Sequence, residues 1–250
     1  MLPSDDPVQG TADDALLSKQ SCSNFGYFKD DFLKFFVRNP VRRSPLINRG
    51  YYARVRTVME IQTSFLKTCP NLKKQIISFG AGFDTSYFRL KTNDINPHNF
   101  FELDFPEVCY RKSSLIQKHA ELRAVITDAK YLKTGEIRSE DYQLISVDLC
   151  HIDKVESSLL KAGMDFSLPT LFLSECVFIY VPPEDSARLI EWTAKNFKLG
   201  VFMIYEQIRP HDPFGQTMIK NLTNRGIFLR SYTTYPTLES QENRFSSLGY

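Results

Sequence analysis

The sequence of 250 residues has no long hydrophobic run. Its longest apolar stretch, Leu171 to Val181, is interrupted by Ser174 and Glu175, whereas a helix that crosses a bilayer needs about 20 apolar residues. The first twenty residues lack the basic and apolar stretches of a secretory signal peptide. We therefore expect a cytoplasmic protein that does not engage a membrane.

Paired cysteines and metal-ligand spacings are also missing. The five cysteines are odd in number, widely spread and without a C-x-x-C pair, and the four histidines show no ligand spacing. This pattern argues against a disulfide framework and predicts no metal site. The sequence has no G-x-S-x-G and no cysteine–histidine signature, so nucleophilic catalysis is unsupported.

Acidic residues are absent from the segment 38–56, although the net charge of the whole chain is only +2. Six arginines and two interleaved tyrosines occur there without any acid, namely Arg38, Arg42, Arg43, Arg49, Tyr51, Tyr52, Arg54 and Arg56. One arginine could hold a carboxylate and the others could meet phosphates. A solvated basic face is the alternative.

The order of patterns along the chain predicts an α/β fold, a doubly wound and mostly parallel sheet behind an N-terminal helical lid. Residues 1–70 are expected to form a disordered start, over 1–14, and then the lid. Residues 71–250 alternate short apolar runs with helical spacing, which favours parallel strands joined by helices. The predicted strands are Gln75–Phe79, Phe100–Leu103, Leu144–Val147, one within Thr170–Tyr180, Val201–Tyr205 and a short extra one at Ala124–Thr127.

The strongest local motif is G-x-G-x-D, which begins at Gly80 directly after an apolar strand. Glycines there let the backbone approach a ligand without a Cβ clash. A tight strand–helix turn without a ligand is the alternative. Thr85 stands where a dinucleotide fold would have its third small residue, which disfavours a nicotinamide cofactor.

Polar residues follow the next strands as well. Asp104 comes 24 residues after Gly80, where an acid accepts hydrogen bonds from ribose hydroxyls. Asp148 could accept an adenine amino group while Leu149 packs on the ring. Glu175 could meet the positive end of a cofactor or pair with an arginine. Because ligands bind at the carboxyl edge of a parallel sheet, these residues together predict a nucleoside-type cofactor site.

The chain resembles the leucine carboxyl methyltransferase family from about Val8 onwards. The motifs that carry the resemblance are Ser18-Lys19, Gly26-Tyr27, Ile47-Asn48-Arg49-Gly50-Tyr51-Tyr52-Ala53-Arg54, Gly80-Ala81-Gly82-Phe83-Asp84, Glu102-Leu103-Asp104-Phe105-Pro106, Arg111-Lys112, Ser174-Glu175-Cys176-Val177, Tyr205-Glu206-Gln207 and Phe214-Gly215-Gln216. The resemblance implies the cofactor S-adenosylmethionine, held by Lys19, Arg54, Gly80, Asp104, Asp148, Leu149 and Glu175.

The family has two eukaryotic branches with different acceptors. One methylates the C-terminal leucine carboxylate of the type 2A protein phosphatase catalytic subunit, and the other a wybutosine precursor in phenylalanine tRNA. Stretches such as Arg42-Arg43-Ser44-Pro45-Leu46-Ile47 and Gln207-Ile208-Arg209-Pro210 resemble the tRNA branch, which we favour here. Tyr205 and Arg209 are our candidates for orienting the acceptor.

The resemblance also predicts what the sheet lacks. Two further strands normally follow the fifth, but here only helical spacing follows Tyr205, so the C-terminal strands are expected to be missing. A binding module that uses the cofactor fold without catalysis is therefore the alternative of another class.

Overall fold

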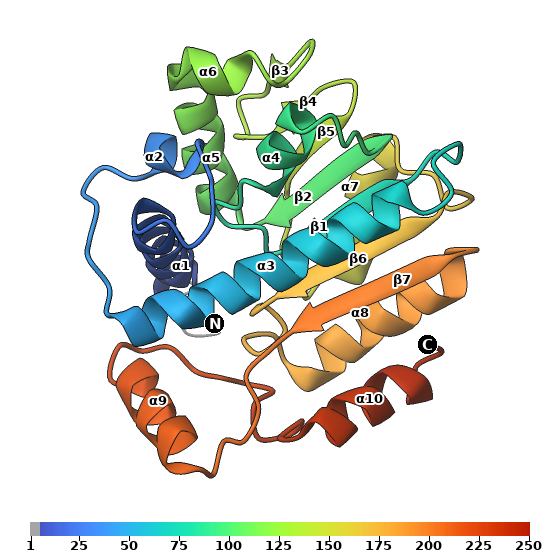
Figure 1. Cartoon of the computed structure of the whole chain (residues 1–250). Coiled ribbons are helices and arrows are strands. Elements are labelled where there is room, and N and C mark those ends of the chain that lie inside the picture. Colours follow the sequence, from blue (N-terminus) through green and yellow to red (C-terminus); the bar gives the residue numbers. More distant parts are fainter. Residues whose placement is uncertain (1–5) are drawn as a thin grey trace.

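The computed structural model describes residues 6–250, which form a seven-stranded sheet with helices on both faces (Figure 1). The strands are β1 (Gln75–Phe79), β2 (Asn99–Asp104), β3 (Lys130–Tyr131), β4 (Ile137–Arg138), β5 (Tyr142–Ser146), β6 (Thr170–Glu175) and β7 (Gly200–Tyr205). Five of them match the strands that the sequence predicts, and the doubly wound α/β fold is confirmed. The extra strand expected at Ala124–Thr127 is wrong, because those residues form turns.

The sheet order is β3-β4-β5-β2-β1-β6-β7. The strands β5, β2, β1, β6 and β7 run parallel, while β3 and β4 form an antiparallel hairpin at one edge. The strand order reverses between β1 and β6, so the crossover helices diverge there. In open α/β sheets this reversal opens a crevice at the carboxyl ends of the strands.

Alternate residues of the central strands point to opposite faces of the sheet, and both faces are buried. Ile76 of β1 lies in a core with helices α4 (Ser86–Thr92) and α5 (Pro106–Lys118). Ile77 lies in a second core with α7 (Ile152–Lys161) and α8 (Pro183–Asn196). Burial on both faces explains why the strands are almost continuously apolar in sequence. The short α6 (Ala120–Arg123) follows α5.

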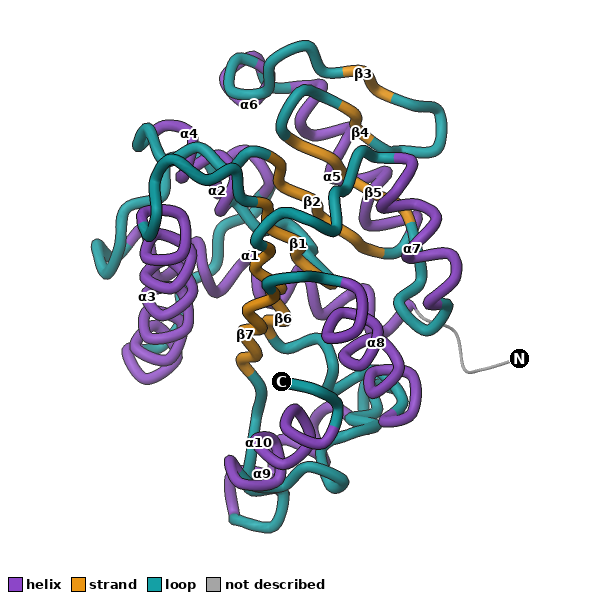
Figure 2. The backbone as a smooth tube through the Cα atoms, turned by 90° about the vertical axis from the view of Figure 1, so that its right-hand side faces the viewer, coloured by secondary structure: helices purple, strands orange, loops and turns teal. Residues whose placement is uncertain are grey.

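The N-terminal helices pack on the first of these faces. They are α1 (Asp6–Asn24), α2 (Leu33–Phe36) and α3 (Pro45–Lys67). Figure 1 shows the N-terminal part of α3 beside α1, near the sheet edge where the parallel strands end, and Figure 2 shows α3 on the side of the sheet opposite α8. The expected disorder of residues 1–14 is corrected for the described part, because α1 already begins at Asp6, and residues 1–5 lie outside the described residues. Pro7 is compatible with this helix because proline is tolerated in a first turn.

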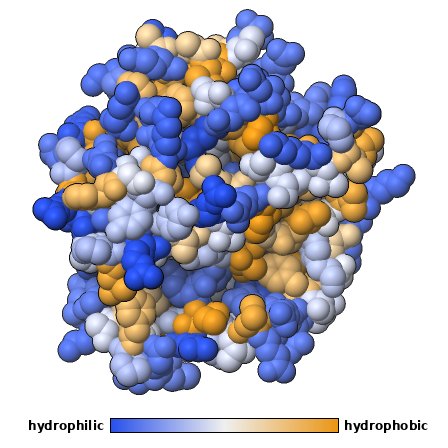
Figure 3. Space-filling model, viewed as in Figure 1, coloured by the Kyte–Doolittle hydropathy of each residue, from blue (hydrophilic) through white to orange (hydrophobic). Residues whose placement is uncertain are grey.

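The segment after β7 forms α9 (Pro213–Thr223) and α10 (Leu238–Ser247), and no further strand occurs in the described chain after Tyr205. β7 therefore pairs only with β6. In Figure 3, hydrophobic side chains gather where β7 lies in Figure 1, and the exposed ones nearby include Leu199 and Val201.

Candidate cofactor and acceptor site

A cavity of about 370 Å³ opens at the carboxyl ends of β1, β2, β5 and β6. Helix α1 covers it with residues from Val8 to Lys19, and α3 contributes Tyr51 and Arg54. All seven residues predicted to bind the cofactor line this one cavity, namely Lys19, Arg54, Gly80, Asp104, Asp148, Leu149 and Glu175. Segments up to 156 residues apart thus meet at one place.

The glycine turn after β1 is closely packed on two sides. Gly80 has φ +58°, and a Cβ there would lie 2.6 Å from Cγ1 of Val177. Gly82 has φ +53°, and a Cβ there would lie 3.3 Å from Cβ of Ala12 in α1. Both positions therefore favour glycine for backbone conformation, and at Gly80 there is also no space for a Cβ.

Asp104 ties the end of β2 to this turn. The Gly82 N–H donates to its Oδ2 at 2.6 Å and the Phe105 N–H to its Oδ1 at 2.8 Å. Burial raises the pKa of the Asp104 carboxyl, and the two amides partly offset that rise. Each carboxylate oxygen has a second lone pair, so both could also accept hydroxyl groups from a ligand in the cavity.

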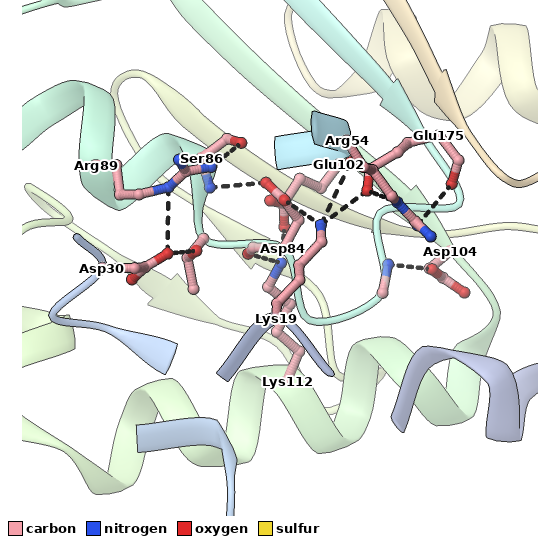
Figure 4. A network of polar contacts seen from close by, with 12 residues as sticks. Lys19, Asp30, Arg54, Asp84, Ser86, Arg89, Glu102, Asp104, Lys112 and Glu175 are labelled. Atoms are coloured by element: carbon pink, nitrogen blue, oxygen red, sulfur yellow. Dashed lines mark hydrogen bonds and ion pairs between the residues drawn. The ribbon is translucent and has the colours of Figure 1, made fainter. Parts of the chain in front are cut away.

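Four charged side chains meet inside the cavity, and we refer to Lys19, Arg54, Asp84 and Glu175 as the cavity cluster (Figure 4). The Lys19 Nζ lies 3.0 Å from Glu175 and 3.2 Å from Asp84, and Arg54 Nε also donates to Glu175. Burial alone would raise the pKa of Glu175, but Arg54 and Lys19 outweigh it and the pKa is lowered. All four groups are therefore charged at neutral pH.

A second charged group lies directly beneath the cavity, and we refer to Lys112 and Glu102 as the sealed pair. Their side chains are fully buried, with Nζ and Oε2 2.5 Å apart. Tyr142 donates to the same Glu102 oxygen at 2.6 Å. Lys112 also donates to the backbone carbonyl of Asp84 at 2.8 Å, so the sealed pair supports the end of the glycine turn from below.

The two residues proposed to orient the acceptor are not on the cavity wall. Tyr205 is half-buried at the end of β7, paired in register with Glu175. Arg209 is exposed, with φ +62°. Arg230 lines the cavity instead and forms no ion pair among residues 6–250. Sequence patterns missed it because it lies in a turn after α9 with no motif around it.

Comparison with known proteins identifies the family. The sequence profile described as "Leucine carboxyl methyltransferase" matches residues 8–194. This chain belongs to the leucine carboxyl methyltransferase family. Members of the family use S-adenosylmethionine, so the predicted cofactor is confirmed, and the protein is a carboxyl O-methyltransferase.

Relatives of both branches match almost the whole chain. A "Leucine carboxyl methyltransferase 1 homolog" of Arabidopsis thaliana is 44% identical over 245 residues, covering 97% of this chain and 74% of that protein. The human "tRNA wybutosine-synthesizing protein 4" is 39% identical over 254 residues, covering 97% of this chain but 37% of that protein. A solved DUF574 family protein of Streptomyces avermitilis shares the fold, with TM-score 0.56 and 11% identity over 80% of this chain and 70% of that one.

The cavity suits a methionine–nucleoside cofactor. It joins buried charges of both signs to a glycine turn with no Cβ in the way. Within residues 6–250, no cluster of His, Cys, Asp and Glu could hold a metal ion, and no helix is long and apolar enough to span a membrane.

Proposed function

We propose that this protein transfers a methyl group from S-adenosylmethionine to the C-terminal leucine carboxylate of a protein, the type 2A protein phosphatase catalytic subunit being the expected substrate. The observation that carries methyl transfer from S-adenosylmethionine is the cavity cluster, which places two cations and two carboxylates beside the glycine turn. The choice of acceptor rests on the relatives and replaces the preference for tRNA drawn from the sequence. The relatives named for leucine carboxyl methylation include the Arabidopsis protein at 44% identity and the Bos taurus protein at 38%.

The charges of the cavity cluster match the amino-acid end of the cofactor. We assign the methionine carboxylate to Lys19 and Arg54 and the ammonium group to Glu175. Asp104 would accept the ribose hydroxyls, since its two oxygens keep free lone pairs, and Asp148 with Leu149 would hold the adenine. When bound, the cofactor supplies an electrophilic methyl group on a sulfonium.

The transfer needs no general base. The acceptor carboxylate is already ionised at neutral pH, so it would need no protein group to remove a proton before it takes the methyl group that the bound cofactor would supply, giving a methyl ester and a neutral thioether. Aligning oxygen, carbon and sulfur can lower such a barrier by about 7–11 kcal/mol, and α1 helps by covering the cavity and excluding water.

The acceptor side of the cavity fits an anion with an apolar side chain. Met218 and Leu222 of α9 line it together with Arg230. A leucine carboxylate offers both features to those residues, because its isobutyl group can pack on Met218 and Leu222 while its charge faces the arginine.

Methylation of the wybutosine precursor in phenylalanine tRNA is the second candidate. Arg42, Arg49 and Arg56 are exposed beside the N-terminal half of α3, and exposed arginines are suited to phosphates. The human relative of that branch supports this alternative.

A transfer assay with labelled S-adenosylmethionine decides between them. The purified phosphatase catalytic subunit, the same subunit without its terminal leucine, and tRNA lacking the wybutosine ester would be offered side by side. Label on the intact subunit alone supports the proposal. Label on tRNA alone supports the second candidate, and cofactor binding without transfer to either would favour a non-catalytic module.

A further inference from the structure

Glu206 is a half-buried acid outside the cavity wall, and its carboxylate is bonded to the turn carrying Glu175. It directly follows β7, while the turn follows β6, and the two strands pair in register at Glu175 and Tyr205. The Val177 N–H and the Phe178 N–H both donate to its Oε1, at 3.0 Å and 2.9 Å. One carboxylate oxygen thus collects successive amides, as in an anion-binding nest.

The turn that Glu206 holds is strained. Cys176 has φ +56°, a left-handed conformation that is uncommon for a residue with a Cβ. Its N–H donates to the Tyr205 carbonyl at 2.7 Å. Such strain persists only where surrounding bonds determine the conformation, and the amides bound by Glu206 come immediately after this residue.

The same turn forms a wall of the cofactor site on both sides of Cys176. Glu175 precedes it and belongs to the cavity cluster. Val177 follows it, and its methyl groups occupy the space that a Cβ on Gly80 would need. Any shift of the turn therefore moves the Glu175 carboxylate and the support of the glycine turn together.

Nothing in the described chain satisfies the other oxygen of Glu206. Its Oε2 is buried without a hydrogen-bond partner among residues 6–250. Burial, the largest influence, raises the pKa of Glu206 to about 7, against the lowering effect of the turn amides and of Arg244 in α10. The group can therefore exchange its proton near neutral pH.

We propose that Glu206 is a positioning residue of the cofactor site: its carboxylate bonds the amides after Cys176 and so fixes Glu175 and Val177 against the cofactor. Ionised carboxylates accept stronger hydrogen bonds than neutral acids, so the ionised form holds the turn more firmly. This role of Glu206 does not depend on which acceptor is methylated, and it rests only on the proposed cofactor site.

The test measures S-adenosylmethionine affinity by calorimetry at pH 6 and pH 8 for the full chain and for E206A, E206Q and the exposed control E242Q. In E206A at least two buried amides lose their acceptor, so affinity at pH 8 should fall about tenfold or more. Glutamine keeps an acceptor oxygen, so E206Q should stay within about threefold of the parent at pH 8. E242Q should match the parent throughout.

The pH comparison separates positioning from simple loss of structure. Between pH 8 and pH 6 the parent should lose about two- to threefold more affinity than E206Q does, since only the parent can protonate position 206. The other ionisable groups facing Glu206 are Cys176 with a pKa of about 12, Tyr180 with a raised pKa, and Arg244. The amino group of the cofactor titrates equally in both proteins.

Two results would overturn the proposal. One is a folded E206A that binds S-adenosylmethionine within twofold of the parent. The other, which also decides the matter if E206A does not fold, is an E206Q protein with the same change of affinity between pH 8 and pH 6 as the parent. Failure of the parent itself to bind the cofactor would instead reject the site assignment.

Discussion

The two buried charge groups of this protein differ in what lies beside them. The sealed pair, Lys112 and Glu102, has no exposed side-chain surface and is closed by Tyr142. In the cavity cluster, by contrast, the side chains of Lys19, Arg54 and Glu175 remain 11–15% exposed. The first group can only hold the fold in place, whereas the second can exchange its partners for a ligand.

The two groups are also physically connected. Lys112 donates to the backbone carbonyl of Asp84, and the carboxylate of Asp84 faces Lys19. Lys112 and Lys19 both lower the pKa of Asp84 against the effect of its burial. Buried charge therefore marks function here only where it borders a cavity, and the predictions below test that distinction.

The largest effect is expected from Lys112→Met in the sealed pair. Removing the ammonium leaves the Glu102 charge buried and unpaired, which should lower the free energy of unfolding by about 3–5 kcal/mol. Thermal unfolding measures this, with exposed Lys118→Met on the same helix as control. Adding Glu102→Gln to Lys112→Met should recover part of the loss. A variant as stable as the control would mean that the sealed pair does not support the fold.

Asp104→Ala should have the largest effect on cofactor binding. It removes two charge-assisted hydrogen bonds to the ribose, each worth about 1.5–3 kcal/mol, so affinity should fall by about a thousandfold or more. It also frees the amides of Gly82 and Phe105, so some loss of stability is expected too. Asp104→Asn keeps an acceptor oxygen for one of those two amides, so a comparison of its stability and affinity with those of Asp104→Ala helps to separate the two effects. Calorimetry that finds unchanged affinity in both variants would reject the site.

Glu175→Gln tests the cavity cluster itself. The change removes the negative partner of the cofactor ammonium and leaves Arg54 without its carboxylate, so affinity should fall by roughly 30–100-fold. The free energy of unfolding, measured without cofactor, should fall much less than in Lys112→Met. Lys19 keeps its ion pair with Asp84, and water can solvate the charges that border the cavity. Exposed Glu121→Gln is the control. A stability loss as large as that of Lys112→Met would erase the proposed difference between the two groups.

The sequence predicted the strand-end residues of the site directly. Gly80, Asp104, Asp148 and Glu175 follow apolar strands, and parallel strands bring their carboxyl ends to one edge. Lys19 and Arg54 came only from the family resemblance. They lie on helices, where spacing defines a face but not the surface that the face will contact.

Other features depended on tertiary contacts that no local pattern contains. The composition of residues 1–14 indicated disorder, yet α1 extends from Asp6 because its residues cover the cavity. Helices of this kind owe most of their stability to packing. The hairpin of β3 and β4 was missed since each strand has only two residues. The role inferred for Glu206 follows from a turn 28 residues away in sequence.

The pKa of Glu206, about 7, predicts a pH effect on stability. This value lies above the usual 4.5 of an unfolded glutamate, so the native state holds the proton of Glu206 more tightly than the unfolded state does. The contribution of this proton to the free energy of unfolding is therefore lost as pH rises through 7. Relative to Glu206→Gln, the parent should therefore lose up to about 2 kcal/mol between pH 5 and pH 8. Melting curves over that range measure it, and parallel curves for the two proteins would contradict it.

The smallest effect is expected at an exposed ion pair that joins α1 to the turn after α9. Arg225 and Asp14 are 2.6 Å apart, with side chains 50% and 42% exposed. Pairs of this kind contribute about 0–1 kcal/mol, so Arg225→Gln should barely change the melting temperature. If α1 must lift for the cofactor to leave, loss of this pair should speed cofactor release by about two- to fivefold.

Stopped-flow displacement of bound S-adenosylmethionine measures that rate, with Lys195→Gln on α8 as the matched control because Lys195 also forms an exposed ion pair. The difference should shrink in high salt, which screens exposed charges. An effect equal to that of Glu175→Gln would place Arg225 within the cofactor site itself. No change in the release rate would mean that α1 is not held closed by this pair, leaving the bonds of Lys19 and the ion pair of Asp13 with Arg111 to attach it beside the cavity.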